Sequence, residues 1–248
     1  MSTVMAETIE RKLRVAAQAR RRDGVVALIR LVGRSAADHV LRSRVERRRA
    51  DFDRHHGVDT AGVIAAEELD HARGRHGDGF SYQTVPIHQT ESIFRALASS
   101  AARPLSDFTF VDLGCGKGLP LMLAMRRGFG SATGVELDSG LAAKARQNAR
   151  TFTARAGIAD DTIEILEQDA AQFEFPERPT ALFLFNPFGA GTLGAVLDRA
   201  AESVTRCPRP FFVAYYNTVH REVFDGHPAV RLVLRTVRWS LYAVEAPA

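Results

Sequence analysis

Short apolar runs alternate with amphipathic helical stretches from Phe108 to the end of the sequence. This alternation is typical of βαβ units, in which parallel strands are buried between layers of helices. The apolar runs predict strands at residues 108–113, 131–136, 162–167, 181–186, 210–216, 229–236 and 238–245. Amphipathic spacing predicts helices at residues 119–128, 139–156 and 190–205, followed by a helical turn near 219–225.

The last two predicted strands are joined too tightly to hold a crossover helix between them. They should therefore pair antiparallel at the edge of the sheet. The sequence thus predicts an α/β fold with a Rossmann-like, mostly parallel seven-stranded sheet, an antiparallel edge hairpin and an N-terminal helical arm.

The helical arm is predicted from two stretches, residues 5–22 and 24–50. In the second stretch, apolar residues recur at helical spacing from Val25 to Leu41, with arginines on the opposite side. A free arm would leave this apolar stripe in water. We therefore expect the arm to pack on the rest of the molecule.

A lead-in segment joins the arm to the sheet. Residues 51–79 are rich in Asp, His and Gly and are expected to be partly irregular, although Thr60 can cap a short helix through Glu67 and Glu68. Residues 88–101 are predicted to form a helix that leads into the main domain.

Composition places the chain among ordinary globular proteins. It has 248 residues, of which 46% are hydrophobic and 25% charged, and only two cysteines, so a disulfide framework is not expected. No run approaches the eighteen apolar residues that would cross a bilayer, and the secretory signal pattern is missing. These features lead us to expect a cytoplasmic protein with no membrane partner.

Positive charge is concentrated in the arm. Residues 1–50 hold 13 Lys and Arg against 5 Asp and Glu, whereas the rest of the chain has a net charge of −4 and the whole chain +4. A solvated helix face is one explanation. Contact with an acidic partner, such as nucleic acid or an acidic protein, is the other.

A glycine-rich turn follows the first strand of the main domain and opens a helix. Residues 112–118 read Asp-Leu-Gly-Cys-Gly-Lys-Gly. Glycines allow the backbone to turn tightly and approach a ligand, and a helix N-terminus supplies free N–H donors. The spacing Gly-x-Gly-x-Gly differs from the dinucleotide fingerprint Gly-x-Gly-x-x-Gly. Asp112 would also repel a pyrophosphate but attract an ammonium group.

Acidic residues follow the next two strands as well. Glu136 ends the second strand, where a ribose diol could donate two hydrogen bonds to its carboxylate, and Asp169 follows the third strand, where it could accept from an adenine amino group. S-adenosylmethionine combines an α-amino group, a ribose diol and an adenine without a phosphate. The pattern therefore points to this cofactor, bound at the carboxyl ends of the strands.

From Phe108 onward the sequence resembles class I S-adenosylmethionine-dependent methyltransferases. Residues 112–118 resemble their first motif, Glu136 their second-strand acid, Asp169 their adenine contact, and Asn186 with Pro187 their fourth motif. Motif and resemblance together place the cofactor contacts at Asp112, Gly114, Cys115, Gly116, Gly118, Glu136, Leu137, Asp169, Ala170 and Asn186.

A narrower resemblance extends into the lead-in. Residues 52–54 (Phe-Asp-Arg) and 57–60 (Gly-Val-Asp-Thr), followed by Tyr82, resemble a group of bacterial methyltransferases of uncharacterised acceptor. Tyr82 and Pro86 before a helix are loosely similar to the non-SET protein-lysine methyltransferases. On this basis the chain divides into a basic helical arm (1–50), a lead-in that covers the cofactor mouth (51–107) and a Rossmann-like methyltransferase core (108–248).

Two residues are candidates for a catalytic role. Asn186, followed by one proline and Phe188, resembles the motif with which amino methyltransferases hold an acceptor nitrogen, although those enzymes typically carry a second proline. A strand-end turn that only lines the cofactor is the alternative. Tyr82 would cover the cofactor and acceptor channel, or would be an ordinary core tyrosine.

Other reactive side chains give weaker signals. His55, His56, His71 and His76 lie in a polar segment without a ligand set, so no metal site is expected. Cys115 is explained by its small size, and no paired base activates it. Lys117 is expected to reach solvent or a nearby carboxylate, an acidic acceptor being the alternative. A proton-transfer role is open for His220.

Three functions remain after this reading. The first is a methyltransferase that acts on a nitrogen or oxygen of a protein or small-molecule acceptor. The second is a nucleic-acid methyltransferase that uses the arginine-rich arm, although the sequence lacks the aromatic and basic stripe of strand-reading surfaces. The third is a non-catalytic cofactor-binding or interaction protein, against which the acids at 112, 136 and 169 argue. Sequence does not fix the oligomeric state.

Overall fold

The computed structural model describes residues 43–64, 82–185 and 188–246, with the backbone alone at residues 63, 64, 82 and 83. Contacts between Cα atoms divide the chain into two compact units, Met1–Arg48 and Arg49–Ala248. The first unit is described only at residues 43–48, which begin a helix that ends at residue 56. The apolar stripe predicted for the arm lies outside the described residues.

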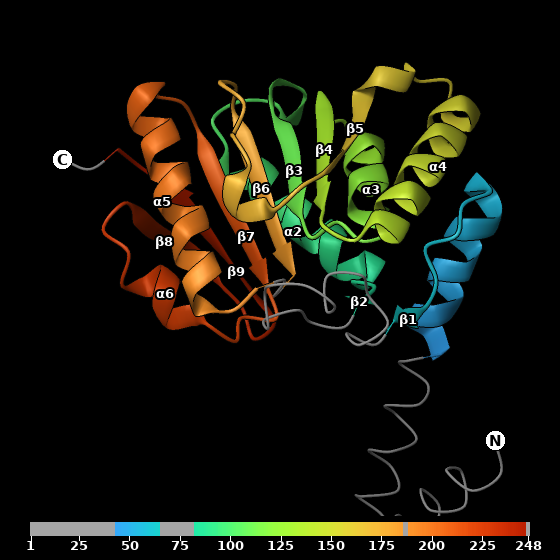
Figure 1. Cartoon of the computed structure of the whole chain (residues 1–248), viewed down its shortest axis with the longest axis horizontal. Helices are drawn as coiled ribbons and strands as arrows, with labels where there is room; N and C mark the ends of the chain where they lie inside the picture. Colours follow the sequence, from blue (N-terminus) through green and yellow to red (C-terminus); the bar gives the residue numbers. More distant parts are fainter. Residues whose placement is uncertain (1–42, 65–81, 186–187, 247–248) are drawn as a thin grey trace, which may run out of the picture. The chain divides into compact units, whose positions relative to one another are not determined.

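The second unit contains a seven-stranded sheet in the order β5-β4-β3-β6-β7-β9-β8 (Figure 1). Its strands are β3 (Thr109–Leu113), β4 (Ser131–Glu136), β5 (Ile163–Glu167), β6 (Thr180–Phe185), β7 (Phe211–Tyr216), β8 (Val230–Arg235) and β9 (Trp239–Val244). The first five run parallel, β9 pairs antiparallel with β7, and β8 pairs antiparallel with β9. The predicted Rossmann-like fold with its antiparallel edge hairpin is confirmed.

Helices cover both faces of this sheet. They are α2 (Ile87–Ser100), α3 (Leu119–Arg127), α4 (Ser139–Ala156), α5 (Ala190–Arg206) and α6 (Arg221–Asp225), with short 3₁₀ turns η3 (Leu105–Asp107), η4 (Asp160–Thr162) and η5 (Ala170–Gln172). Apolar residues of α2, α3 and α4 share one buried cluster with Phe110 and Phe183 of the sheet. Those of α5 and α6 share a second cluster with Val111 and Leu182, the neighbours of these two phenylalanines along the strands. Successive strand residues therefore serve opposite layers.

The sheet brings the predicted ligand-binding segments to one edge. Because β3, β4, β5 and β6 are mutually parallel, their carboxyl ends lie side by side. The N–H of Gln168, just after β5, donates to the carbonyl oxygen of Glu136 at 3.1 Å, which holds these two strand ends together. This edge carries the candidate site.

The lead-in differs from the prediction in two places. The helix that begins within the first unit continues to residue 56 and ends at Gly57, whose φ of 67° favours glycine. Thr60 caps no helix before residue 64: its hydroxyl and N–H donate to the Asp53 carboxylate at 2.7 and 3.1 Å. Val63–Ile64 form strand β1, which pairs antiparallel with β2 (Tyr82–Gln83). The predicted helical segment through Glu67 and Glu68 lies outside the described residues.

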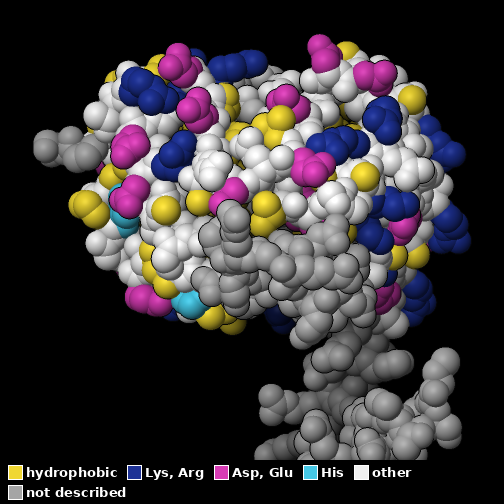
Figure 2. Space-filling view, in the orientation of Figure 1, with side chains coloured by type: hydrophobic (Ala, Val, Ile, Leu, Met, Phe, Trp, Pro, Cys, Tyr) yellow, Lys and Arg dark blue, Asp and Glu magenta, His cyan; other side chains and the backbone are white. Residues whose placement is uncertain are grey.

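Charges are mixed on the surface that Figure 2 shows. In this view, basic and acidic side chains of the described residues are interspersed over the molecule and gather into no single patch of one sign. A surface that tracks a phosphate backbone concentrates cations instead. In the described part of the chain, none of the helices combines the length and apolar character that crossing a membrane requires.

Candidate active site

The glycine-rich turn connects β3 to α3 through three residues with positive φ. Gly114, Gly116 and Gly118 have φ of 78°, 54° and 82°, values that side chains disfavour. The N–H groups of Gly114 and Cys115 donate to the carbonyl oxygen of Val135 at 2.8 and 3.0 Å, which holds the turn against β4. The tight turn that the sequence predicted from its glycines is therefore present, and its role in binding a ligand stays a prediction.

Glu136 is buried at the end of β4 and accepts hydrogen bonds from three backbone groups. Its Oε2 accepts from Gly116 N–H at 2.8 Å, and its Oε1 from Leu137 and Asp138 N–H at 2.9 and 3.0 Å. Burial raises the pKa of this carboxyl, and the three hydrogen bonds counteract part of the rise. A carboxylate has about four lone-pair sites, so three backbone donors leave capacity for a ligand hydroxyl.

Asp112 is 2% exposed, and its carboxylate accepts no hydrogen bond from the residues that the structure describes. Burial and the neighbouring Glu136 raise its pKa well above the ordinary value for an aspartic acid. A buried carboxylate without a donor is costly unless a cation or proton accompanies it. The site therefore lacks a positive partner for Asp112, and an ammonium group of a ligand would supply one.

A glycine in β4 allows close packing against Cys115 of the glycine-rich turn and Leu121 of α3. Gly134 of β4 is the Cα partner of Asp112 in β3. A Cβ on Gly134 would lie 2.6 Å from Leu121 Cδ1 and 2.8 Å from Cys115 Sγ. A larger residue here would therefore displace these side chains, and the position was not singled out from the sequence because an isolated strand glycine has no distinctive pattern.

The end of β5 supplies a third acidic side chain. Asp169 caps η5, with its Oδ1 accepting from Ala171 N–H at 2.9 Å. Ala170 is buried, whereas Leu137 after β4 is 44% exposed, which is unusual for a large apolar side chain. A flat aromatic ring lying between these two segments would cover Leu137.

The three acids fit S-adenosylmethionine in the order in which their strands lie. Adenine would lie by Asp169 at β5, the ribose by Glu136 at β4, and the amino acid part by Asp112 at β3. The donor-free carboxylate of Asp112 is the observation that supports this fit, because a phosphate-bearing cofactor would place negative charge beside it. The strand ends of β6 and β7 remain for an acceptor.

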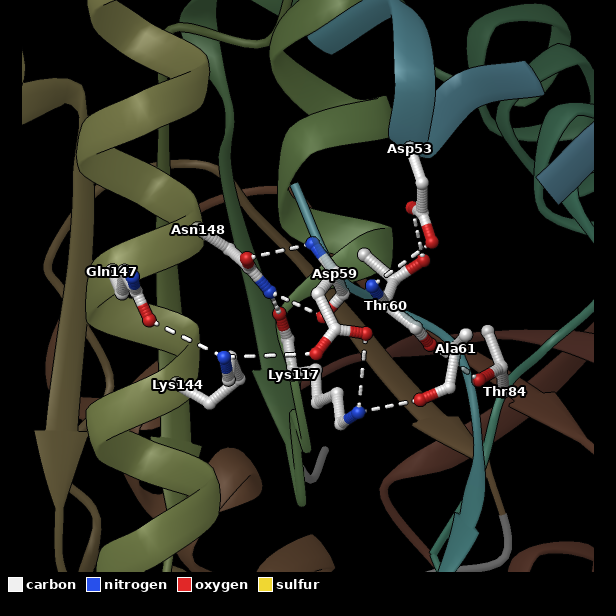
Figure 3. A network of polar contacts seen from close by, with 9 residues as sticks. All are labelled: Asp53, Asp59, Thr60, Ala61, Thr84, Lys117, Lys144, Gln147 and Asn148. Atoms are coloured by element: carbon white, nitrogen blue, oxygen red, sulfur yellow. Dashed lines mark hydrogen bonds and ion pairs between the residues drawn. The ribbon is translucent and has the colours of Figure 1, made fainter. Parts of the chain in front are cut away.

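A hydrogen-bond network joins the lead-in to the glycine-rich turn (Figure 3). The side-chain amide of Asn148, in α4, accepts from Asp59 N–H at 3.0 Å and donates to the carbonyl oxygens of Asp59 and Lys117 at 2.9 and 3.0 Å. The Thr84 hydroxyl donates to the carbonyl oxygen of Thr60 at 2.9 Å. The sequence analysis missed Asn148, because its partners lie 89 and 31 residues away.

Lys117 belongs to the same network. Its Nζ donates to the carbonyl oxygen of Ala61 at 2.5 Å and lies 3.4 Å from Asp59 Oδ1, while Lys144 Nζ lies 3.6 Å from Asp59 Oδ2. The Lys117 side chain is only 13% exposed. Of the two readings given from sequence, the nearby carboxylate is the one that the structure contains.

The side chains of the two catalytic candidates lie outside the part of the chain that the structure describes. Asn186 lies outside the described residues, between the end of β6 and Phe188. Tyr82 belongs to β2, and only its backbone is described. Their roles remain predictions.

The remaining candidates have structural explanations where they are described. His56 packs against Phe52 and Phe152, with ring centroids 4.5 and 4.9 Å apart, and burial lowers its pKa. Burial raises the pKa of the Cys115 thiol well above its ordinary value, which keeps it protonated. His220 Nδ1 lies 3.5 Å from Glu222 Oε1. In the described ranges no three His, Cys, Asp or Glu side chains are grouped to hold a metal; His71 and His76 fall outside them.

Comparison with known protein families gives a match at this site. Residues 111–185, from β3 to the end of β6, match the family model of a methyltransferase domain. This match spans the glycine-rich turn, Glu136 and Asp169. By this match, residues 111–185 are similar to a methyltransferase domain, and such a domain implies S-adenosylmethionine as the cofactor. A search of the curated proteins finds none that matches.

Among solved structures, several methyltransferases are similar to this chain. Magnesium protoporphyrin IX methyltransferase from Synechocystis PCC 6803 with bound SAM has a TM-score of 0.48 and 15% identity over 64% of this chain and 79% of that one. An RNA methyltransferase from Salinibacter ruber with S-adenosyl-L-homocysteine has a TM-score of 0.43 and 20% identity, over 66% of this chain and 94% of that one. Ribosomal protein L11 methylase from Lactobacillus delbrueckii subsp. bulgaricus has a TM-score of 0.46 and 15% identity, over 67% of this chain and 81% of that one. At these identities, what each protein acts on is not carried over to this chain.

Proposed function

We propose that this methyltransferase transfers the methyl group to a nitrogen or oxygen of a small-molecule or protein acceptor that binds beside the ends of β6 and β7. The observation that carries this proposal is the donor-free, buried carboxylate of Asp112 next to the hydrogen-bonded carboxylate of Glu136. In this proposal, Asp112 and Glu136 hold the cofactor at the ends of β3 and β4. The acceptor would then bind at the remaining strand ends of this edge, those of β6 and β7.

The chemistry required of the protein is mainly positioning. When bound, S-adenosylmethionine supplies a methyl group on a positively charged sulfur. The carbon–sulfur bond breaks as the acceptor atom forms its bond to carbon, and the acceptor gives up its proton to solvent or a nearby group. Holding the two reactants in line can lower the barrier by roughly 7–11 kcal/mol.

Residues of this chain serve that positioning in distinct ways. Asp112 would hold the ammonium group of the cofactor and Glu136 its ribose diol. The turn at Gly116 would lie against the part of the cofactor between these two groups. Asn148 and Lys117 fix the lead-in next to that turn. As in the sequence prediction, Asn186 would orient the acceptor atom from the end of β6.

The experiment that tests this function uses the full chain and cofactor labelled on the methyl group. The protein is incubated with cell extract separated into small-molecule, protein and nucleic-acid fractions, and retention of label is measured in each. We expect label in the small-molecule or protein fraction. Asp112→Asn serves as the matched control, because it keeps the side-chain shape and removes the charge that would hold the cofactor.

Two results would contradict the proposal. Label that appears mainly in nucleic acid would favour the alternative in which the arginine-rich arm binds phosphates. Tight cofactor binding without transfer to any fraction would favour a non-catalytic protein.

A further inference from the structure

A cavity lies at the carboxyl end of β7, on the acceptor side of the candidate site. Its volume is about 460 Å³, and it is lined by residues 216–219, Arg221 and residues 237–238. In the sheet, β7 follows β6, which follows β3. Adjacent strands are about 4.8 Å apart, so the cavity begins roughly 10 Å from the strand that carries Asp112. At this distance from Asp112, the cavity would hold a substrate that binds next to the cofactor rather than the cofactor itself.

One residue that lines the cavity, Tyr216, contacts the end of β6. The Tyr216 ring contacts Phe185, with centroids 4.9 Å apart and ring planes at 80°. Phe185 is the last residue of β6, and Asn186 follows it in sequence. A ligand in the cavity would therefore lie beside the segment that is predicted to present the acceptor atom.

Hydrogen bonds fix the wall of the cavity. Asn217 adopts a φ of 55°, a left-handed conformation that asparagine tolerates. Its N–H donates to the carbonyl oxygen of Arg238 at 2.9 Å, which ties the end of β7 to the turn between β8 and β9. The Thr236 hydroxyl donates to the carbonyl oxygen of Trp239 at 2.8 Å and closes that turn. The cavity is thus built from ordered backbone.

Among the described residues that line the cavity, two are arginines and none carries a carboxylate. Arg221 Nη2 donates to the Thr218 hydroxyl at 3.3 Å, while its Nε is buried and has no acceptor among the described residues. The side chain of Arg238 makes no ion pair or hydrogen bond with the part of the chain that the structure describes. Glu222, the nearest acid in sequence, lies 3.5 Å from His220 instead.

Other arginines of the same hairpin are paired. Arg235 Nη2 lies 2.5 Å from Asp225 Oδ1, and Arg231 Nη2 lies 2.7 Å from Glu245 Oε1. Arg231 and Arg235 of the hairpin therefore have acidic partners, whereas the two arginines that line the cavity have none among the described residues. This contrast indicates that the missing partner of the cavity arginines is a ligand.

The rim of the cavity is apolar. Val219 is 57% exposed and Val237 is 97% exposed, and both line the cavity. Large exposed apolar side chains at the rim, beside the half-buried Arg221 and the exposed Arg238, suit a ligand with an apolar body and one anionic group.

We propose that this cavity binds the carboxylate or phosphate group of the methyl acceptor, which is a small organic anion with an apolar body. Arg221 and Arg238 would hold the anion, because a guanidinium group matches the geometry of both carboxylate and phosphate. The valines at the rim would contact the apolar body. This inference rests on the proposed function, since it names the acceptor class of the same site.

The test uses the full chain labelled with ¹⁵N and saturated with S-adenosylhomocysteine, with inorganic phosphate and succinate as probes. Backbone amide signals of Asn217, Thr218 and Val219 and the Nε–H signal of Arg221 are followed by NMR during each titration. We expect saturable shifts with at least one probe. Stronger binding of phosphate would indicate a phosphorylated acceptor, and stronger binding of succinate a carboxylate.

Three variants sharpen this test. Arg221→Gln and Arg238→Gln should each weaken binding of the probe about tenfold, and Arg221→Lys should restore part of it, because it keeps the charge without the bidentate geometry. Arg206→Gln is the matched control, since Arg206 pairs with Glu177 at the far end of α5 and should leave binding unchanged. Circular dichroism of each variant confirms that it is folded.

The outcomes separate this inference from the proposed function. Absence of saturable shifts, or equal affinities in folded Arg221→Gln, Arg238→Gln and Arg206→Gln proteins, would overturn the anion site while cofactor binding by calorimetry stands. Failure of S-adenosylhomocysteine to bind would overturn the proposed function and with it the assignment to an acceptor.

Discussion

The N–H of Gly116 donates a 2.8 Å hydrogen bond to Oε2 of Glu136, so the turn after β3 is held by the carboxylate at the end of β4. The side chain that is predicted to bind the ribose therefore also shapes the loop that approaches the rest of the cofactor. Loss of Glu136 would remove a ligand contact and release three backbone donors at once. Its two roles can be distinguished by comparing two substitutions.

Glu136→Ala should weaken S-adenosylmethionine binding by about 1.5–3 kcal/mol, the value of hydrogen bonds to a charged group, and should also lower the melting temperature because backbone N–H groups lose their acceptor. Glu136→Gln should be milder in both respects, since the amide oxygen can still accept from Leu137 and Asp138. Calorimetric titration and thermal unfolding measure the two effects. Affinity equal to that of the unsubstituted protein in both variants would remove Glu136 from the cofactor site.

Strand and helix positions could be predicted because local pattern determines them. Continuous apolar runs such as residues 181–184 can only be buried on both faces, and the glycines of residues 114–118 mark a turn by their spacing. The places of Asp112, Glu136 and Asp169 at or just after strand ends followed from the predicted strands, and their contacts with the cofactor stay predictions. These features depend on residues that are near one another in sequence.

Features that depend on distant partners were not predicted. The helix continues past the expected boundary to residue 56 because Phe52 and His56, one turn apart, pack against Phe152 of α4. Thr60 was expected to cap a helix, but residues 63–64 form a strand whose partner, residues 82–83, is distant in sequence. The unneutralised arginines at the end of β7 could be recognised only after the pairing of Arg235 with Asp225 was known.

Asn148→Ala should detach the lead-in from the glycine-rich turn. Three hydrogen bonds of the Asn148 amide would be lost, two of them to Asp59, and unsatisfied groups in part-buried positions cost about 1–3 kcal/mol each. We expect a lower melting temperature and faster hydrogen exchange at the Asp59 amide. Gln147→Ala, which changes an exposed neighbour on the same helix, is the control. Unchanged exchange at Asp59 would show that the network does not hold the lead-in.

Asp112→Asn should stabilise the protein without cofactor while weakening cofactor binding. Because the pKa of Asp112 is raised in the folded state, its ionisation lowers stability as pH rises from the unfolded value near 4 through the folded value. Above that window, the full cost of the buried charge is present, and asparagine removes it. For a chain of this size, each kcal/mol regained raises the melting temperature by about 2–4 °C. The expected gain at pH 8 should shrink toward pH 4, and a lower melting temperature at pH 8 would contradict it.

The same carboxyl makes cofactor binding depend on pH. The ammonium group of the ligand would bind the ionised form of Asp112, whereas burial favours the protonated form in the free protein. Binding should therefore release a proton, and affinity for S-adenosylhomocysteine should increase with pH, by up to tenfold per unit, until the pH exceeds the raised pKa of Asp112. Calorimetry at pH 5, 6, 7 and 8, in two buffers with different heats of ionisation, measures both the affinity and the number of protons released.

Asp112→Asn provides the control for this pH dependence. The amide cannot titrate, so the variant should bind more weakly and its affinity should vary less with pH. Any dependence that remains would come from other groups, such as His56, whose pKa is lowered by burial and which lies on the lead-in rather than at the turn. If the two proteins show the same slope of affinity against pH, Asp112 does not pair with the ammonium group. The positive part of the cofactor would then have to lie at another residue of this strand edge.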